Sequence, residues 1–484
     1  MTSERLKVLF AAFEVSPFIK TGGLGDVAGA LPNALREEGI DCRVVMPLLS
    51  TISDEYKKDM RKIGEMSVPL GWRNQYLGIY KLIYKNVVYY LLDNEYYFKR
   101  DKAYGYFDDG ERIAYFSKAI LEFLQKVDFS PDVIHLNDWH TALASVYLRE
   151  MYRGIEKYDK MKSIITVHNL KFQGMYSTFV LDDITGLGYI KDARRQLLQK
   201  DSVNFLRGGL NYTDYITTVS PTYANEIKTD YFGEKLNDIF VRRSDIVTGI
   251  LNGIDYEKYN PKTDENIYQN YDINSFEYKV KNKKKKKKEK WLNVDENIPM
   301  VCMITRLTEQ KGIDLVTATL DELMWTTNCQ FMLLASGDKK YEDAFRFFEH
   351  KYRGRVSSNI YFSEELSRKI YASSDLMLIP SRFEPCGLTQ MISMRYLTLP
   401  IVRETGGLKD TVVPYNQFTN EGNGFSFSNY NAHELLYTVK NALDLYNNNR
   451  EVFNQLVKNA SLTDFSWKKS ALEYIKIYNK IMSY

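Results

Sequence analysis

The order of hydrophobic and polar positions predicts strands and helices in alternation along most of the chain. Short apolar runs typical of buried strands are separated by segments whose apolar residues recur every three or four positions, as in helices. The strand-like runs of the first half are Leu6–Phe13, Cys42–Met46, Val87–Leu92, Val133–Leu136, Ile164–Val167 and Ile216–Val219. Those of the second half are Met300–Ile304, Phe331–Ala335, Ile360–Phe362, Leu376–Ile379 and Ile401–Val402. Since strands that alternate with helices form parallel sheets, the pattern predicts an α/β protein with two Rossmann-like, doubly wound domains.

A polar stretch rich in Asn, Tyr and Lys separates the two series of strands. We predict a first domain over residues 1–258, a linker over 259–276 and a second domain over 277–460. The last segment, 461–484, contains an amphipathic helix from Trp467 onward with no strand after it. It therefore reads as a helix added after the second domain rather than as part of its sheet.

Composition and charge narrow the classes of function. Among the 484 residues, 65 Lys and Arg face 62 Asp and Glu, which gives a net charge of +3 and no indication of binding to nucleic acid or to a membrane. A hydrophobic content of 44% excludes a disordered chain. The four cysteines are far apart in sequence, which predicts neither a disulfide scaffold nor a zinc site. No leader pattern and no run approaching the ~18 apolar residues of a membrane span is visible, so we expect a cytoplasmic protein.

One charged segment stands out, the unbroken lysine run Lys283–Lys288 at the start of the second domain. Such a run can bind nucleic acid or heparin. No aromatic residues interleave with it, however, and the whole chain is nearly neutral. We therefore expect a solvated helix or loop.

The first strand is followed by a turn rich in glycine, Lys20–Val27. Glycines let the backbone approach a bulky anion, a helix start offers free N–H groups, and Lys20 adds a positive charge. Neither the dinucleotide pattern GxGxxG nor a Walker A loop is present. On its own the turn indicates either a phosphate site or simply a tight turn.

Charged residues also follow strands of the second domain. Arg306 and Lys311 come directly after Met300–Ile304, where the open edge of a parallel sheet usually binds its ligand. Two cations at this spacing suit a diphosphate, although a surface pair is an equally good interpretation of these two residues alone.

A carboxylate lies between a strand and a helix start further along. Glu384 follows Leu376–Ile379, and Gly387 and Leu388 open the next helix. The two backbone N–H groups could hold a phosphate while Glu384 binds a hydroxyl-bearing group. The same order of strand, double glycine and helix recurs around Thr405 and Gly406.

Polar and aromatic residues end two strands of the first domain. Asp138, Trp139 and His140 follow one strand, and His168 and Asn169 follow another. Carboxylate, imidazole, amide and indole groups together suit a sugar, which presents both hydroxyls and a flat apolar face. A structural histidine remains an alternative for His168.

Together these motifs resemble those of bacterial and plant glycogen (starch) synthases, retaining glucosyltransferases of the GT-B fold. The segments that carry the resemblance occur in family order and are Lys20–Val27, Asp138–His140, Val167–Leu170, Thr218–Ala224, Gly249–Asp255, Arg306–Gly312, Pro380–Gln390 and Thr405–Val412. The resemblance implies two domains that face a deep cleft, the second binding the nucleotide sugar, and a C-terminal helix that crosses back to the first domain. It implies transfer of glucose from ADP-glucose to the non-reducing-end 4-hydroxyl of an α-1,4-glucan, such as glycogen or a maltooligosaccharide.

The resemblance also implies roles for individual residues. The implied catalytic residues are Glu384, His168, Arg306, Lys311 and Asp138. The implied substrate-binding residues are Lys20, Gly23, Asn169, Asn252, Phe362, Cys386, Gly387, Leu388, Thr405 and Gly406. In the family pattern Arg306 and Lys311 bind the diphosphate, and Phe362 lies against the nucleobase. We expect no cofactor and no metal, because no Asp-x-Asp site is evident and the cations would replace Mg²⁺.

Other interpretations stay open at this point. A related glucosyltransferase could use UDP-glucose or a small acceptor, and a catalytically silent protein could bind glucan without acting on it. The presence of Lys20, His168, Arg306, Lys311 and Glu384 argues against the silent protein.

Overall fold

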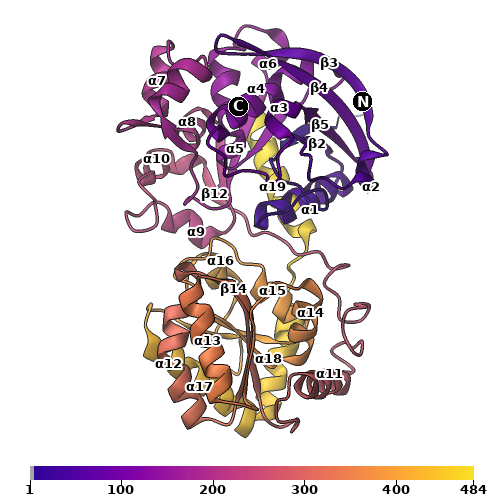
Figure 1. Ribbon diagram of the computed structural model, residues 1–484, viewed down its shortest axis with the longest axis vertical. Coiled ribbons are helices and arrows are strands. Elements are labelled where there is room, and N and C mark those ends of the chain that lie inside the picture. The colour runs from indigo at the N-terminus through magenta and orange to yellow at the C-terminus, as the bar shows by residue number, and fades with distance from the viewer. Residues whose placement is uncertain (1–4, 484) are drawn as a thin grey trace. The chain divides into compact units, whose positions relative to one another are not determined.

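The structure is a computed structural model that describes residues 5–483 (Figure 1). The chain divides into two compact units. The first runs to Gly253 and also includes the C-terminal segment from Trp467, and the second is Ile254–Ser466. The segment 259–276, interpreted above as a linker, is part of the second unit.

The first unit is built on a nine-stranded sheet with the order β12-β11-β7-β6-β1-β2-β5-β4-β3. The parallel strands are β1 (Lys7–Ala11), β2 (Asp41–Pro47), β5 (Val87–Asp93), β6 (Val133–Asn137), β7 (Lys162–Val167), β11 (Tyr215–Thr218) and β12 (Val247–Gly249). All six strand-like runs predicted for this half are confirmed. The strand order reverses between β1 and β6, which makes the sheet doubly wound and opens a ligand-binding edge there.

An antiparallel hairpin that the sequence pattern did not predict extends one edge of this sheet. It consists of β3 (Arg61–Leu70) and β4 (Arg73–Tyr84). Most residues of β3 are exposed, so the strand lacks the continuous apolar run by which the parallel strands are recognised. A small second sheet comprises β8 (Met175–Ser177), β9 (Leu198–Gln199) and β10 (Ser202–Asn204).

The helices of the first unit connect these strands. They are α1 (Gly23–Glu37), α2 (Asp54–Lys57), α3 (Glu95–Phe98), α4 (Asp109–Glu122), α5 (Trp139–Glu150), α6 (Glu156–Asp159), α7 (Lys191–Leu197), α8 (Phe205–Tyr212), α9 (Pro221–Glu226) and α10 (Asn237–Arg242). The C-terminal helix α19 (Trp467–Met482) packs beside α1, as the family resemblance implied. The Tyr478 hydroxyl lies 2.7 Å from His135 Nδ1 on β6, which ties this helix to the sheet.

The second unit is built on a six-stranded parallel sheet with the order β15-β14-β13-β16-β17-β18. Its strands are β13 (Met300–Leu307), β14 (Gln330–Gly337), β15 (Val356–Asn359), β16 (Leu376–Ile379), β17 (Leu399–Arg403) and β18 (Phe425–Phe427). This order reverses between β13 and β16, so this sheet is doubly wound as well. The predicted strand Ile360–Phe362 is wrong: β15 ends at Asn359, and the apolar residues after it lie in a loop where Phe362 is 84% exposed.

Helices cover both faces of this sheet. They are α11 (Phe276–Glu289), α12 (Ile313–Thr326), α13 (Lys339–Lys351), α14 (Glu364–Ser373), α15 (Thr389–Arg395), α16 (Gly406–Thr411), α17 (Ala432–Asn448) and α18 (Arg450–Leu462). Figure 1 shows α12, α13 and α17 on one side of the sheet and α14, α15 and α18 on the other. The unit is therefore a three-layer α/β structure.

The lysine run lies within α11, and the expectation of a solvated helix or loop holds for only half of its residues. Lys283, Lys286 and Lys287 are buried, whereas the other lysines of the run are exposed. Lys283 Nζ lies 2.7 Å from Asp375 Oδ2, and Lys287 Nζ donates to the carbonyl oxygen of Asp295 at 2.6 Å. The helical period turns half of the run inward, where carbonyl and carboxylate oxygens satisfy the ammonium groups.

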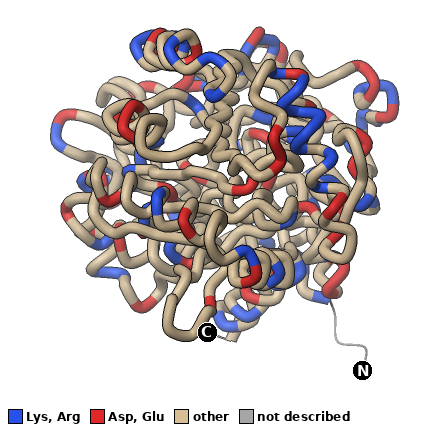
Figure 2. Tube along the Cα trace, turned by 90° about the horizontal axis from the view of Figure 1, so that it is seen from below, with Lys and Arg blue, Asp and Glu red and all other residues tan. Residues whose placement is uncertain are grey.

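The charges of the chain as a whole are mixed. Figure 2 shows positions of both signs interspersed along the trace. Within residues 5–483, no helix combines the length and the apolar character needed to cross a membrane.

Candidate active site

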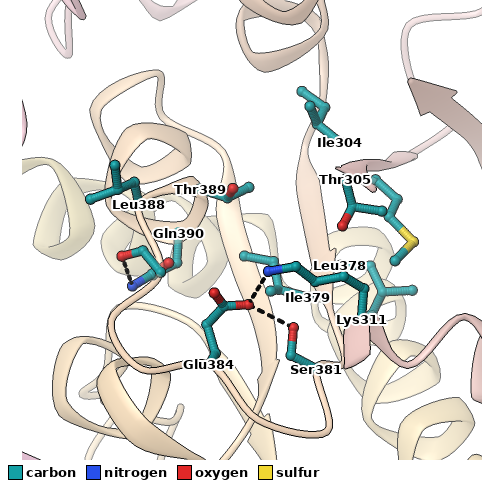
Figure 3. Close-up of a pocket in the computed structure, with 12 residues that line it drawn as sticks. Ile304, Thr305, Lys311, Leu378, Ile379, Ser381, Glu384, Leu388, Thr389 and Gln390 are labelled. Atoms are coloured by element: carbon teal, nitrogen blue, oxygen red, sulfur yellow. Dashed lines mark hydrogen bonds and ion pairs between the residues drawn. The ribbon is translucent and has the colours of Figure 1, made fainter. Parts of the chain in front are cut away.

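Two loops that follow β13 and β16 enclose a small cavity at the point where the second sheet reverses its strand order (Figure 3). The cavity holds about 40 Å³, and Lys311, Glu384, Gly387 and Leu388 are among its lining residues. Lys311 Nζ lies 2.6 Å from Glu384 Oε2, and Ser381 Oγ donates to the same oxygen at 2.9 Å. The structure therefore brings together four of the predicted site residues.

Glycines allow a second loop to approach Glu384. A Cβ atom at Gly406 would lie 2.1 Å from the carbonyl oxygen of Glu384, and one at Gly407 would lie 2.1 Å from that of Cys386. The N–H of Gly407 donates to the Glu384 carbonyl at 3.1 Å. The double glycine thus joins the start of α16, with the buried Thr405, to the Glu384 loop.

Two predicted residues of the second unit lie outside the wall of this cavity. Arg306, the residue before the last of β13, is exposed and forms no ion pair with any described residue. Phe362 presents its ring to solvent in the loop before α14. Both side chains are accessible to a ligand.

In the first unit, the glycine-rich turn is organised by Glu14, a residue that the sequence analysis missed. Its buried carboxylate accepts hydrogen bonds from the Thr21 N–H, from Thr21 Oγ1 at 2.7 Å and from the Gly22 N–H at 3.3 Å. Lys20 Nζ lies 2.8 Å from Asp26 Oδ1. Apart from its chain neighbours and the backbone of its own helix, no heavy atom of the described residues lies within 4 Å of the position a Cβ would take on Gly23, so the start of α1 is open to a ligand.

The ends of β6 and β7 are joined through Asp138 and His168. Asp138 has a φ of 55°, a conformation uncommon for a residue other than glycine, and its Oδ1 accepts a hydrogen bond from the His168 N–H at 2.7 Å. Burial raises the pKa of the Asp138 carboxyl to about 7. A strained backbone with a buried carboxylate at a strand end is typical of functional sites.

The tautomer of His168 follows from its neighbour Asn137. Asn137 Nδ2 donates to the carbonyl of Ala11 at 3.0 Å, so its Oδ1 is the atom that faces His168 Nε2 at 2.9 Å. An amide oxygen can only accept, which places the proton of His168 on Nε2 and leaves Nδ1 as an acceptor. Burial lowers the pKa of His168 to about 3, so its imidazole is neutral near pH 7.

A larger cavity of about 500 Å³ lies beside Trp139 in the first unit. Gly174 adopts a φ of 65°, and a Cβ there would lie 2.4 Å from the indole, so the chain crosses the ring closely. The cavity combines aromatic rings with polar groups, a mixture that suits an oligosaccharide. The lining side chains of these two kinds include Tyr104, Trp139, Phe172 and Tyr176, with Asp109, Gln173 and Gln199.

The two remaining predicted site residues of the first unit are the amides Asn252 and Asn169. Asn252 is buried, and its Oδ1 has no hydrogen-bond partner among the described residues. A buried acceptor without a partner is a position that a ligand hydroxyl can satisfy. Asn169 Oδ1 accepts a hydrogen bond from the Lys171 N–H at 3.1 Å.

Comparison with known proteins assigns the chain to a family. Residues 7–242 match the starch synthase catalytic domain, and residues 283–461 match the glycosyl transferases of group 1. The glycogen synthase of Clostridium novyi (strain NT) is 48% identical over 478 residues, which cover 99% of each chain. That of Geobacillus stearothermophilus is 48% identical over 477 residues, covering 99% of this chain and 98% of the relative. The chain belongs to the glycogen synthase family.

Solved structures agree with this assignment. The catalytic domain of starch synthase IV from Arabidopsis thaliana, bound to ADP and acarbose, is similar with a TM-score of 0.90 at 32% identity, over 99% of this chain and 100% of that one. Sucrose-phosphate synthase from Thermosynechococcus elongatus, with a TM-score of 0.59 at 16% identity over 99% of this chain and 100% of that one, shares the fold alone. The predicted GT-B class is confirmed, and this family member is a glycosyltransferase.

Within residues 5–483, no group of three or more His, Cys, Asp or Glu side chains could hold a metal ion. That the enzyme needs no metal remains a prediction.

Proposed function

We propose that this glycosyltransferase transfers glucose from ADP-glucose to the 4-hydroxyl at the non-reducing end of an α-1,4-glucan with retention of configuration. The Lys311–Glu384 pair at the ligand-binding edge of the second sheet is the observation that carries this proposal. Membership of the glycogen synthase family and likeness to a starch synthase bound to ADP and acarbose support it.

The donor half of the proposed site uses charge. Lys311 and Arg306 bind the diphosphate and stabilise the negative charge that grows on ADP as it leaves. When the diphosphate engages Lys311, Glu384 is released to accept hydrogen bonds from glucose hydroxyls. Backbone N–H groups of Gly387 and Leu388 add to the phosphate contacts, and Thr405 and Gly406 hold the loop of Glu384 and Cys386 in place.

Further donor contacts follow from the family resemblance. We propose that Phe362 lies against the nucleobase and that Lys20 and Gly23 contact the diphosphate. The exposed ring of Phe362 and the open space at Gly23 are compatible with these roles.

The acceptor half uses the strand ends of the first unit. We propose that the glucan enters the cavity beside Trp139 and stacks on its aromatic side chains. His168 and Asn252 offer acceptors for sugar hydroxyls, and Asp138 and Asn169 hold the loop at His168. The acceptor oxygen bonds to the anomeric carbon on the face from which the phosphate oxygen departs. The departing phosphate oxygen takes up the proton that the acceptor hydroxyl loses.

Transfer of label tests the proposal. The protein is supplied with radiolabelled ADP-glucose or UDP-glucose, together with glycogen or a maltooligosaccharide, and polymer-bound glucose is measured. We expect incorporation from ADP-glucose well above that from UDP-glucose. A reversed preference would identify the related UDP-glucose enzyme, and no incorporation by folded protein from either donor would identify a glucan-binding protein without activity.

We place the reaction in the cytosol.

A further inference from the structure

An exposed indole in the first unit that lines neither of the cavities described above is held in a fixed orientation. Trp72, in the turn between β3 and β4, is 76% exposed. Its Nε1 donates a hydrogen bond to Asp183 Oδ1 at 3.0 Å. The guanidinium carbon of Arg73 lies 4.5 Å from the centre of the ring. The ring is therefore fixed both at its edge and by a cation at its face.

The partners of Trp72 are themselves held firmly. Arg73 donates to the Asp183 carbonyl at 3.0 Å and to its Oδ2 at 2.8 Å, and its Nε lies 3.3 Å from Glu111 Oε1. A Cβ at Gly71, where φ is 58°, would lie 2.5 Å from the same carbonyl. The turn is thus packed closely against the helical segment Val180–Ile184.

Exposure alone does not distinguish this residue, because Trp291 and Trp325 are 89% and 80% exposed. Neither of these two indoles has a hydrogen-bonded Nε1 or a cation over its ring anywhere in the described part of the chain. The hydrogen bond and the cation at Trp72 do not serve to bury apolar surface, because most of the ring stays exposed to water. They do reduce the entropy lost when a ligand stacks on the ring.

The charges next to Trp72 are paired with each other: Arg73 with Asp183 beside the indole, and Lys62, whose Nζ lies 5.6 Å from the centre of the Tyr76 ring, with Glu65. Asn74 and Tyr76 follow on β4 and are both exposed, and they lie on one face of the strand because side chains alternate. Across the hairpin they pair with Pro69 and Ser67, which are exposed as well. Two aromatic rings with the uncharged Asn74 between them, flanked by charges of both signs that are already paired, match a chain of pyranose rings better than they match nucleic acid, an anionic membrane or a charged protein surface.

We propose that Trp72 forms a surface site for the α-glucan polymer, outside the cavity beside Trp139. A pyranose ring stacks on the open part of the indole, and neighbouring sugars contact Asn74 and Tyr76. A long glucan held here raises the effective concentration of chain ends for the active site, whereas a short maltooligosaccharide cannot use both sites. The identity of the ligand rests on the proposed function.

The test compares Trp72→Ala with Trp325→Ala, a control at an exposed indole that is not fixed. We expect Trp72→Ala to weaken co-sedimentation with glycogen and to raise the KM for glycogen about 5- to 10-fold, the order of one lost stacking contact. The kcat, the KM for maltotriose and all properties of Trp325→Ala should match the wild type. Unchanged glycogen binding by folded Trp72→Ala would overturn the inference, as would a change in oligomeric state without a change in glycogen binding.

A second measurement detects binding in the wild-type protein, with Trp72 in place. The chain is labelled with 5-fluorotryptophan and titrated with maltoheptaose, and the ¹⁹F signal of Trp72 is assigned by its absence from Trp72→Phe. A shift of this signal with those of Trp291 and Trp325 unchanged supports the site, and an unmoved signal overturns it. Because these binding measurements contain no sugar donor, they distinguish failure of the surface site from failure of the proposed transfer reaction.

Discussion

Lys311 Nζ lies 2.6 Å from Glu384 Oε2, so the cation proposed to bind the diphosphate and the carboxylate proposed to bind the glucose are paired with each other. Both side chains are largely buried. Without the pair, each would place an uncompensated charge in a poorly hydrated loop. The pair keeps both groups in position, and a diphosphate can replace the carboxylate as the partner of Lys311.

Removal of either member should stop turnover. We expect Lys311→Ala and Glu384→Ala each to lower kcat by at least ~10²-fold, because each removes a group aimed at charge or hydroxyls in the transition state. Glucose incorporation from saturating ADP-glucose measures this. Lys351→Ala is a matched control, since Lys351 pairs with Asp321 at 2.7 Å on the surface of the same unit. Near-normal turnover in both site variants would refute the assigned roles.

The predicted tautomer of His168 can be tested through Asn137. Asn137→Asp places a negative charge beside Nε2, which should raise the pKa of His168 from about 3 towards its ordinary range. A protonated ring loses its Nδ1 acceptor, so kcat of the variant should fall on acidification between about pH 8 and 5, in the range where histidine ordinarily titrates. The wild type should lack this histidine step, whereas a step caused by Asp138, with its pKa of about 7, would be common to the wild type and the variant.

Asn169→Asp is the control for this experiment, because Asn169 Oδ1 contacts the Lys171 N–H and not the imidazole. ¹⁵N spectra of labelled histidine provide an independent measure. They should show a protonated Nε2 and a bare Nδ1 in the wild-type ring, and the opposite assignment would contradict the interpretation.

Three histidines with lowered pKa values, the buried His135 and His140 and the partly buried His168, should make the first unit sensitive to acid. Burial lowers the pKa values of His135, His140 and His168 from 6.5 to about 3. Between these values the unfolded chain binds more protons than the folded one, so stability is complete above pH 6.5 and falls as the pH decreases towards 3. Each histidine contributes about 1.4 kcal/mol per pH unit within this window.

Asp138 acts in the opposite direction, because its folded pKa of about 7 lies above the ordinary 3.8 and the folded state retains its proton. Together these four groups contribute a slope near pH 5 of about 3 kcal/mol per pH unit. Urea unfolding at a series of pH values measures it. His135→Gln should reduce the slope by the contribution of one proton, about 1.4 kcal/mol per pH unit. His350→Gln, at an exposed site, should leave the slope unchanged. An unchanged slope in folded His135→Gln would contradict a neutral His135 in the fold.

Chelation should leave the reaction intact. If Lys311 and Arg306 neutralise the diphosphate, incorporation of glucose after treatment with EDTA should equal that of untreated enzyme. Activity that disappears on chelation and returns with added Mg²⁺ or Mn²⁺ would contradict the cation-based account.

Much of the fold could be predicted because parallel strands buried on both faces read as continuous apolar runs. Leu376–Ile379 matches β16 residue for residue. The failures have physical causes. Ile360–Phe362 is apolar but lies in an exposed loop, and β3 is a strand with mostly exposed side chains. The lysine run is polar by composition, yet half of it is buried because the helix turns those residues inward.

The site residues that could be predicted are likewise those that follow a recognisable strand in the sequence. Lys311 and Glu384 could be placed together because both follow strands, β13 and β16, that are neighbours in a parallel sheet. Asp138 and His168 meet for the same reason at β6 and β7. Glu14 lies just after β1. Its place as a charged residue after a strand could have identified it as a candidate site residue. Tyr104 comes from a loop with no motif, and its position depends on packing that no local pattern encodes.

The most direct test of the central claim, that lysine side chains bind the diphosphate of the donor, is the affinity for ADP measured by calorimetry. We expect Lys311→Ala to bind ADP at least ~10-fold more weakly than the wild type, the loss of one charge-assisted contact, while Lys351→Ala binds it normally. Equal affinity of the wild type and Lys311→Ala for ADP would contradict the account.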